Sequence, residues 1–472
     1  MRERIWLTLA VGAARKIAAL AALATLAGVL ARPAAGQLPL PTGGQALANL
    51  TTAGAQDESA VAIDPNGNFL VVWRDEFLDG NASAIIGRRF SARTGQPLSG
   101  EFLINLTTVG DQRNPAIAMA DDGRFVVVWE GPDTFATVTP GIFGSLRAAN
   151  GTAIAAEFPI NANVGGVQRR PAVAMQPGGA FLVAWQDEVP VGLTRGVTSQ
   201  EISGRIYPAN FPAAPPGNPF VVNVNIDGDQ EQPAVAALPA TGGWLVGWQG
   251  PRQFSPPIPM ILVRALAANG SGSGEFGANT SQSGVQRSHV ALAANGQGEA
   301  VAVWEAPDAS FRGIFARRIV DGVPSGTEEQ INLTATRDER EPSVAIDQRG
   351  GFVTVWVSEP PPTPLQGESP EGSPIIIQGR KKSGGAGFAE LDQPQVPQVP
   401  PMDGEFQIST LGLALADPWV AAEPGGNFVV AWQGADPADP LNDSVYYRGF
   451  RDALFADDFE TGNTTRWSAA LP

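Results

Sequence analysis

A tryptophan at the end of an apolar segment recurs seven times along this chain, and no other feature constrains the fold as strongly. A glycine stands six residues before each tryptophan without exception. Flanking sequences such as Asp-Pro-Asn-Gly at 64–67 are typical of tight hairpin turns, where glycine adopts a positive φ that a side chain would penalise. We therefore expect a positive φ at most of these glycines. The pairs are Gly67 and Trp73, Gly123 and Trp129, Gly179 and Trp185, Gly242 and Trp248, Gly298 and Trp304, Gly350 and Trp356, and Gly426 and Trp432.

Each unit of the repeat holds four short strand-like segments. A first strand is expected at segments such as 115–119, a second between the glycine and the tryptophan, a third at segments such as 85–90, and a fourth at segments such as 101–105. The second strand is apolar on both faces, which is typical of a strand that is covered on both sides. Four antiparallel strands per unit, repeated four to eight times, indicate a β-propeller. The sequence predicts an all-β fold, a seven-bladed β-propeller, in preference to an open array or a row of small sandwiches.

The last unit has no fourth strand of its own. It runs as far as a third strand at 445–450, whereas a segment that resembles the fourth strands precedes the first unit at 45–50. Pairing of these two segments would complete seven blades and remove two exposed sheet edges. We expect this pairing to close the ring.

The pattern Gly-x-Phe-x-Val-x-Trp, with Gln-x-x-Pro-Ala-Val-Ala upstream, resembles tandem repeats in exported bacterial proteins of uncharacterised function. The resemblance covers residues 45–451. The expected ring closure is similar to that of WD40 propellers, but the Gly-His and Trp-Asp pairs of that family are missing. Sialidase Asp-boxes and the calcium loops of FG-GAP propellers are not matched either. No function of these families transfers, since a likeness of fold alone does not license one.

The ends of the chain differ from the repeats. Basic residues precede an apolar run at 17–30 that is too short for a membrane helix, and small residues follow at 34–36. We interpret 1–36 as a signal peptide, 37–451 as the propeller, and 452–472 as an acidic and aromatic tail that is either a sorting element or a strap packed on the propeller. The mature chain is then expected to be a monomer without a membrane span that is secreted, periplasmic or on the cell surface.

Composition excludes several classes of site. The chain has no cysteine and one histidine, His289, so a Cys/His zinc site, a cysteine nucleophile and disulfides are excluded. The net charge of −16 argues against a nucleic-acid partner. Since His289 falls where other units have proline at the start of the first strand, we expect it to be structural. No metal or other cofactor is expected.

Two sets of equivalent polar residues recur in the repeat. The first set stands at the entry to the first strand, and if first strands line the central channel it would surround one mouth and could bind a ligand. Its alternative role is to satisfy backbone groups. Its members are Gln56, Gln112, Gln168, Gln230, Gln286 and Glu339. The second set consists of arginines on the third strand, with Ser145 as the exception, which we expect to bridge neighbouring blades. These arginines are Arg88, Arg205, Arg264, Arg317, Arg380 and Arg448.

The variable loops between second and third strands are rich in acid, with sixteen Asp or Glu against four Arg. Among them are Asp75, Glu76, Asp187 and Glu188, which follow two of the tryptophans. Because function usually lies in variable loops on a rigid scaffold, these residues predict an acidic binding face, although charge for solubility would give the same pattern.

The function expected from the sequence is a non-enzymatic extracytoplasmic binding or scaffold propeller. Its acidic, long-looped face would engage a protein, a glycan or a cationic ligand. The alternative is a carbohydrate-active hydrolase that uses carboxylates of the same loops. A convergent acid pair with one raised pKa would favour the enzyme, and dispersed, solvated carboxylates would favour the binder.

Overall fold

The computed structural model describes residues 40–451 except 77, 133–139, 162–165, 192–196, 227, 253–257, 281–286, 309, 361–373, 383–403, 411–414 and 437–441. The expected signal peptide (1–36) and tail (452–472) lie outside the described residues. Every regular element in the described part of the chain is a β-strand. The search for a helix long and apolar enough to cross a membrane finds none there.

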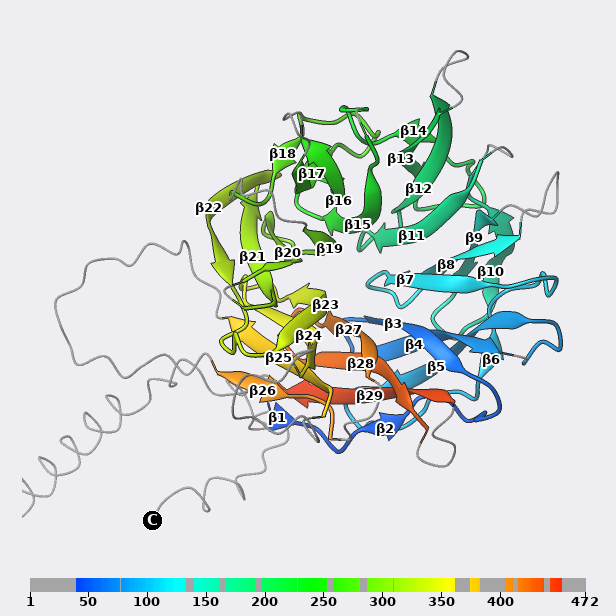
Figure 1. Ribbon diagram of the computed structural model, residues 1–472. Helices are drawn as coiled ribbons and strands as arrows, with labels where there is room; N and C mark the ends of the chain where they lie inside the picture. Colours follow the sequence, from blue (N-terminus) through cyan, green and yellow to red (C-terminus); the bar gives the residue numbers. More distant parts are fainter. Residues whose placement is uncertain are drawn as a thin grey trace, which may run out of the picture.

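The strands form seven separate antiparallel sheets arranged around a centre, as Figure 1 shows, which confirms the predicted seven-bladed β-propeller. The first six blades each use four consecutive strands. Blades 1 to 3 are β3 (Gln56–Ile63), β4 (Asn68–Glu76), β5 (Ser83–Ser91) and β6 (Phe102–Leu103); β7 (Arg113–Met119), β8 (Phe125–Pro132), β9 (Pro140–Arg147) and β10 (Ala153–Pro159); and β11 (Gln168–Met175), β12 (Phe181–Val191), β13 (Val197–Tyr207) and β14 (Phe220–Val221). Blades 4 to 6 are β15 (Glu231–Leu238), β16 (Gly243–Arg252), β17 (Ile258–Leu266) and β18 (Phe276–Gly277); β19 (Ser288–Ala294), β20 (Glu299–Pro307), β21 (Arg312–Val320) and β22 (Val323–Gln330); and β23 (Asp338–Ile346), β24 (Phe352–Glu359), β25 (Ile376–Lys382) and β26 (Glu405–Gln407).

The seventh blade closes the ring with residues from both ends of the described chain. It contains β27 (Ala416–Ala422), β28 (Phe428–Ala435) and β29 (Asp443–Arg451), and β29 pairs with β1 (Leu40–Pro41) and β2 (Ala46–Leu47). Ala46 lies opposite Tyr447 in the register. Asn49 continues this pairing, since its Oδ1 accepts a hydrogen bond from the backbone N–H of Val445 at 3.0 Å. The expected pairing of 45–50 with 445–450 therefore completes the last blade.

The apolar second strands explain how the blades stack. Leu70 and Val72 of β4 pack with Phe125 and Trp129 of β8 in one cluster. The opposite face of β8 packs against blade 3, because Val128 belongs to a cluster that contains Trp185. All seven repeat tryptophans are at most 1% exposed. A second strand is thus buried on both faces by its neighbours, as its sequence predicts.

The turn glycines behave as expected. All seven repeat glycines have a positive φ, from 67° at Gly242 to 93° at Gly179 and Gly426. In blade 2 the backbone N–H of Gly123 donates to the carbonyl of Ala120 at 2.9 Å, which closes the turn between β7 and β8.

The third-strand arginines connect adjacent blades. Arg88 of blade 1 donates to the carbonyl of Ala48 at 2.8 Å, and Arg448 of blade 7 donates to that of Ile408 at 2.8 Å. Blade 2 has Ser145 at this position, but Arg147 two residues later donates to the carbonyl of Ile104 at 2.9 Å. The remaining contacts run from Arg205 to Ile160, Arg264 to Val222, Arg317 to Ala278 and Arg380 to Ile331. The predicted bridging role is confirmed, and each blade is bonded to the one before it.

Candidate ligand site at the channel mouth

The first strands of the blades surround a central channel. Each first strand contacts the first strands of both neighbouring blades, and Figure 1 shows β3, β7, β11, β15, β19, β23 and β27 on the inner side of the ring. A cavity of about 320 Å³ is lined by residues from all seven first strands and the turns that follow them, among them Ala62, Ala118 and Ala236. Its lining comes from the later part of each first strand and the turn to the second, so it lies at the end of the channel opposite the starts of the first strands.

Each first strand carries a β-bulge near its start. The register between first and second strand shifts there in every blade, for example between Asp57 and Ala60. One residue of each bulge has a positive φ of 48° to 56° although it is not glycine. We call these seven residues the mouth ring: Glu58, Asn114, Arg170, Gln232, His289, Glu341 and Asp417. A bulge leaves its extra residue out of the ladder, which lets proline follow the mouth-ring residue in five blades.

The mouth ring is held by hydrogen bonds from blade to blade. Each of its backbone N–H groups donates to a side chain of the preceding blade. In four blades the acceptor follows the repeat tryptophan of that preceding blade, as when Arg170 donates to Glu130 Oε1 at 2.6 Å. Glu58 donates likewise to Gln433 at 2.9 Å, Gln232 to Gln186 at 3.3 Å, and Glu341 to Glu305 at 2.6 Å. The acceptor is otherwise a mouth-ring side chain, in the pairs Asn114 to Glu58, His289 to Gln232, and Asp417 to Glu341.

The mouth lies on the face of the loops between second and third strands. The start of the first strand pairs with the end of the second, as in Gln56 opposite Asp75, and the loop to the third strand follows directly. The variable loops and the entries of the first strands, with the mouth ring, therefore share one face.

Carboxylates gather on one side of the mouth, in blades 6, 7 and 1. Burial, together with the nearby charges of Glu341, Glu58 and Asp57, raises the pKa of Asp417 to about 7. Burial also raises the pKa of Glu58, and it raises the pKa of Asp57 to about 6 although Arg74 lies 3.2 Å from its carboxylate. We call Glu58, Glu341 and Asp417 the acidic arc.

The other side of the mouth is basic. Arg169 and Arg170 are exposed in blade 3, and His289 projects from blade 5 with 47% of its side chain exposed. His289 Nδ1 lies 3.0 Å from Oε1 of the buried Glu305. The hydrogen bond to Glu305 raises the pKa of His289, and the negative charge of Glu341 acts in the same direction.

His289 does not occupy the position that the sequence suggests. The structure aligns it with Asn114, so that Val290 stands where blade 2 has Pro115. The turn between the first and second strands is one residue longer in blade 4 than in blade 2. Pro233 of blade 4 therefore stands as far before its tryptophan as His289 does in blade 5, which makes the two positions look equivalent in the sequence. His289 is a member of the mouth ring.

The glutamine set lies just behind the mouth, within the blades. Its members Gln56, Gln112, Gln168, Gln230 and Glu339 are 0% to 1% exposed. Gln56 accepts from Asn49 at 3.1 Å and donates to the carbonyl of Gly54 at 3.0 Å. Gln286 lies outside the described residues, and the register places Arg287 at its expected position. These contacts match the role of satisfying neighbouring polar groups, because no described member reaches the surface.

The acids that follow the tryptophans are only partly at the surface. Asp75 is 0% and Asp187 is 5% exposed, whereas Glu76 and Glu188 are half-buried. Burial raises the pKa of Asp75 to about 7. Of the twelve loop acids within the described residues, six are buried, namely Asp75, Glu130, Asp187, Glu201, Glu305 and Asp436. The negative charge that these loops expose to solvent is therefore smaller than the number of acidic residues suggests.

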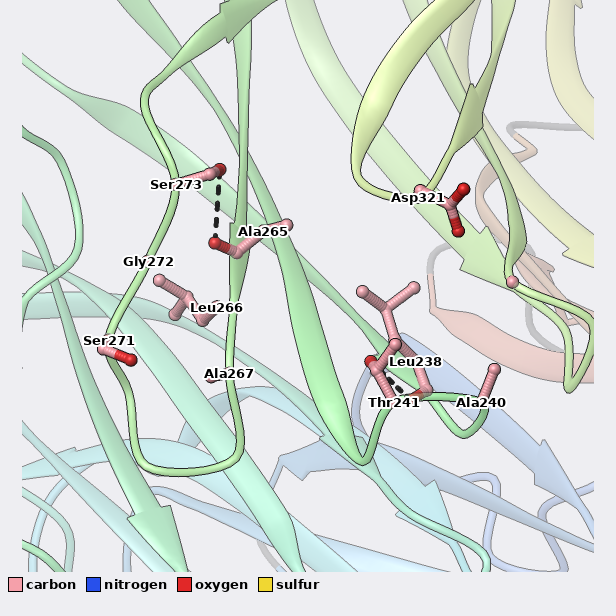
Figure 2. A pocket seen from close by; sticks show the side chains of 11 residues that line it. Leu238, Ala240, Thr241, Ala265, Leu266, Ala267, Ser271, Gly272, Ser273 and Asp321 are labelled. Carbon is pink, nitrogen blue, oxygen red and sulfur yellow. Dashed lines mark hydrogen bonds between the residues drawn. The ribbon is translucent and has the colours of Figure 1, made fainter.

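A second cavity lies away from the mouth, between blades 4 and 5. It measures about 380 Å³, and Figure 2 shows its lining, including Leu238, Leu266 and Asp321. Thr241 and Ser273 direct their hydroxyls at the backbone carbonyls of Leu238 and Ala265, at 3.3 and 3.4 Å. Because Asp321 is the one ionisable residue among those that line it, this cavity offers little chemistry.

A metal site is not apparent in the described part of the chain, where no three His, Cys, Asp or Glu residues are placed to hold an ion. Sequence reasoning missed the mouth ring as a set. The signal that could have found it is the residue directly before the first-strand proline, as in Asn114, Arg170, Gln232, Glu341 and Asp417. A bulge itself has no sequence signature strong enough to be recognised without the structure.

No protein-family model matches this chain, and no curated protein matches it. Solved structures with a similar course include a protein of unknown function from Dyadobacter fermentans, 11% identical, covering 88% of this chain and 99% of that one, with a TM-score of 0.49. An ulvan lyase of a polysaccharide lyase family is 9% identical over 92% of this chain and 98% of its own, with a TM-score of 0.49. An α-L-arabinofuranosidase from Podospora anserina is 11% identical over 89% and 99%, with a TM-score of 0.36. At these values the similarities carry no functional inference.

Proposed function

We propose that this chain is an extracytoplasmic binding propeller that holds a glycan at the mouth ring. The observation that carries the proposal is the composition of the ring. It presents carboxylates on one side and cationic groups on the other, with the amide Asn114 between Glu58 and Arg170 and the amide Gln232 between Arg170 and His289. A polyhydroxylated ligand needs hydrogen-bond donors and acceptors together, which this mixture supplies.

The structure favours a glycan over a polycation as the ligand. A polycation would need a broad exposed field of one sign, but half of the described loop acids are buried. The mouth ring also brings polar groups of several kinds together at the starts of the seven first strands. A few convergent polar groups are typical of sites for small polar ligands.

The test is a screen of the purified protein against neutral glycans, acidic glycans and polycations, followed by two mouth variants. Glu58→Gln and Asp417→Asn remove charge, and glutamine already serves as the blade-to-blade acceptor at Gln433 and Gln186. Both variants should fold and should weaken glycan binding about tenfold. Glu188→Gln, on a half-buried loop position, is the control and should bind normally. Selective binding of polycations, or binding that ignores both mouth variants, would contradict the proposal.

A second candidate, a carbohydrate-active hydrolase, is favoured by one observation. Asp417 and Glu341 are neighbours, because the backbone N–H of Asp417 donates to Glu341 Oε2 at 2.9 Å, and the pKa of Asp417 is raised to about 7. A pair of neighbouring carboxyl groups of which one has a raised pKa is the arrangement that glycoside hydrolysis uses.

Release of reducing sugar ends from the glycans that bind would test this candidate. The hydrolase requires turnover that Asp417→Asn and Glu341→Gln each abolish while binding persists. Binding without any turnover would reject the hydrolase and leave the binding function in place.

A further inference from the structure

His289 makes a contact that another residue makes in a different blade. In blade 5 its Nδ1 lies 3.0 Å from Glu305 Oε1, which also accepts the backbone N–H of Glu341 from blade 6. In blade 2 the amide of Asn114 donates to Glu130 Oε1 at 2.8 Å, and that oxygen accepts the N–H of Arg170 from blade 3. An asparagine therefore meets the structural need of this position. What a histidine adds is a second nitrogen, Nε2, and a positive charge.

Glu305 fixes the orientation of the imidazole. It is 1% exposed, and its Oε2 accepts the Ser288 hydroxyl at 3.0 Å, with Arg312 at 3.8 Å. Burial alone would raise the pKa of Glu305, but the hydrogen bond and charge of His289, the N–H of Glu341 and the charge of Arg312 together lower this pKa. An ionised carboxylate on Nδ1 leaves Nε2 to point away from Glu305, on a side chain that is 47% exposed.

Arg170 supplies a second cationic group on the same side of the mouth. It is exposed, and within the described residues it makes neither an ion pair nor a side-chain hydrogen bond. It is near enough to His289 for its charge to oppose protonation of the imidazole. A guanidinium that has no ion pair among the described residues, on the same side of the mouth as a protonated imidazole, is suited to bind a carboxylate.

We propose that His289 and Arg170 bind the carboxylate of an acidic saccharide, with its hydroxyls directed towards the rest of the mouth ring. This inference rests on the proposed glycan function and specifies the chemistry of its ligand. The charged groups that face His289 are Glu305, Glu341 and Arg170, from β20, β23 and β11. Of these, Glu305 holds Nδ1 and leaves Nε2 available for the ligand.

The experiment compares oligogalacturonate with its methyl ester, which has the same sugar ring but no charge. The unaltered protein should bind the acid at least about tenfold more tightly than the ester. Its preference for the acid over the ester should fall as the pH rises through the pKa of His289, because the imidazole then loses its charge. A change in affinity that acid and ester share would instead come from the carboxyl groups of the mouth ring, such as Asp417.

His289→Asn is the decisive variant, since asparagine keeps the hydrogen bond to the glutamate as Asn114 does in blade 2. It should unfold at the same temperature as the unaltered protein and should lose the preference for the acid together with the pH dependence of that preference. Arg170→Gln should also lower the affinity for the acid about tenfold. Arg93→Gln removes an exposed positive charge from the turn between β5 and β6 and should change nothing.

Three outcomes separate this inference from the function on which it rests. Equal affinity for acid and ester, or a normal preference in His289→Asn, would overturn the inference and leave mouth binding in place. Failure to bind oligogalacturonate, with a neutral glycan bound at the mouth, would do the same. Failure to bind any glycan would overturn both the inference and the proposed function.

Discussion

Single positions of the repeat show that a hydrogen bond can persist when the residue that makes it changes. Where the residue after the tryptophan cannot accept, as with Arg74 in blade 1 and Val357 in blade 6, the mouth-ring residue of that blade accepts instead. Glu58 and Glu341 take this role, so the next blade's N–H remains paired. Such substitutions are expected where an unpaired backbone group would cost free energy.

The turn glycines allow a prediction about one side chain. Gly123 has a φ of 80°, and a Cβ built on it would lie 2.9 Å from the Cβ of Ala149. Gly123→Val should lower the free energy of unfolding by about 1 kcal/mol or more, because a β-branched residue fits neither this φ nor this space. Chemical denaturation measures the change. Gly178→Ala is the control, since a Cβ there meets nothing within 4 Å, and a loss as large as that of Gly123→Val would contradict the explanation.

The buried acid of blade 6 predicts how stability depends on pH. Burial raises the pKa of Glu339 from 4.5 to about 8. The folded state therefore holds a proton that the unfolded state releases, and stability should decrease as the pH rises from about 4.5 to about 8. Glu339→Gln should reduce this dependence, because it restores the glutamine found in blades 1 to 4. Gln112→Glu should create the same dependence in blade 2. If the pH dependence of the unfolding temperature is unchanged in both variants, the argument is contradicted.

At the level of strands and blades, much of the fold can be predicted from the sequence, because turns, tryptophans and apolar alternation recur at corresponding places. The bridging arginines can be predicted because they recur at the same position in every blade except blade 2, which has Ser145. The closing segment can be predicted because only the last repeat lacks a fourth strand. The bulges and the replacement of Ser145 by Arg147 could not be predicted. A bulge depends on backbone geometry, and Arg147 reaches its carbonyl through a contact between blades that no local pattern encodes.

Ring closure can be tested with two deletions. Removal of residues 37–44 takes away β1, whereas removal of 37–50 also takes away β2, Gln45 and Asn49. Asn49 bonds to Val445, Ser444 and Gln56, and Gln45 accepts from Thr410 at 2.8 Å. The longer deletion should destabilise the protein by about 3 kcal/mol or more beyond the shorter one. Hydrogen exchange in β29 should rise with it, and equal thermal stability of the two deletions would refute closure.

The arginine of blade 2 offers a test by rescue. Arg147→Ser should lower the free energy of unfolding by about 1 to 3 kcal/mol, because the carbonyls of Leu103 and Ile104 lose their charged donor. Adding Ser145→Arg should recover part of this loss, since arginine then stands where the other six blades have it. If the double variant is no more stable than Arg147→Ser, an arginine at this position of the third strand does not stabilise the contact between blades.

For the molecule as a whole, the sequence predicts which segments share a face but not which of their side chains are exposed there. The variable loops and the entries of the first strands do share one face, as the alternation of strands requires. The glutamine set lies one step inside that face, because the side chains at these entries turn into the blade while the bulge turns the next residues to the mouth. The burial of half of the described loop acids could not be predicted either, since a count of charges does not distinguish a buried carboxylate from an exposed one.

The central claim is that a closed ring of seven blades binds its ligand at the mouth ring. A crystal structure of the protein with its tightest glycan from the screen tests this claim most directly. We expect the saccharide over the channel, in hydrogen-bond contact with the acidic arc on one side and with His289 or Arg170 on the other. A saccharide bound in the cavity between blades 4 and 5, or on the outer fourth strands, with none at the mouth, would contradict the claim.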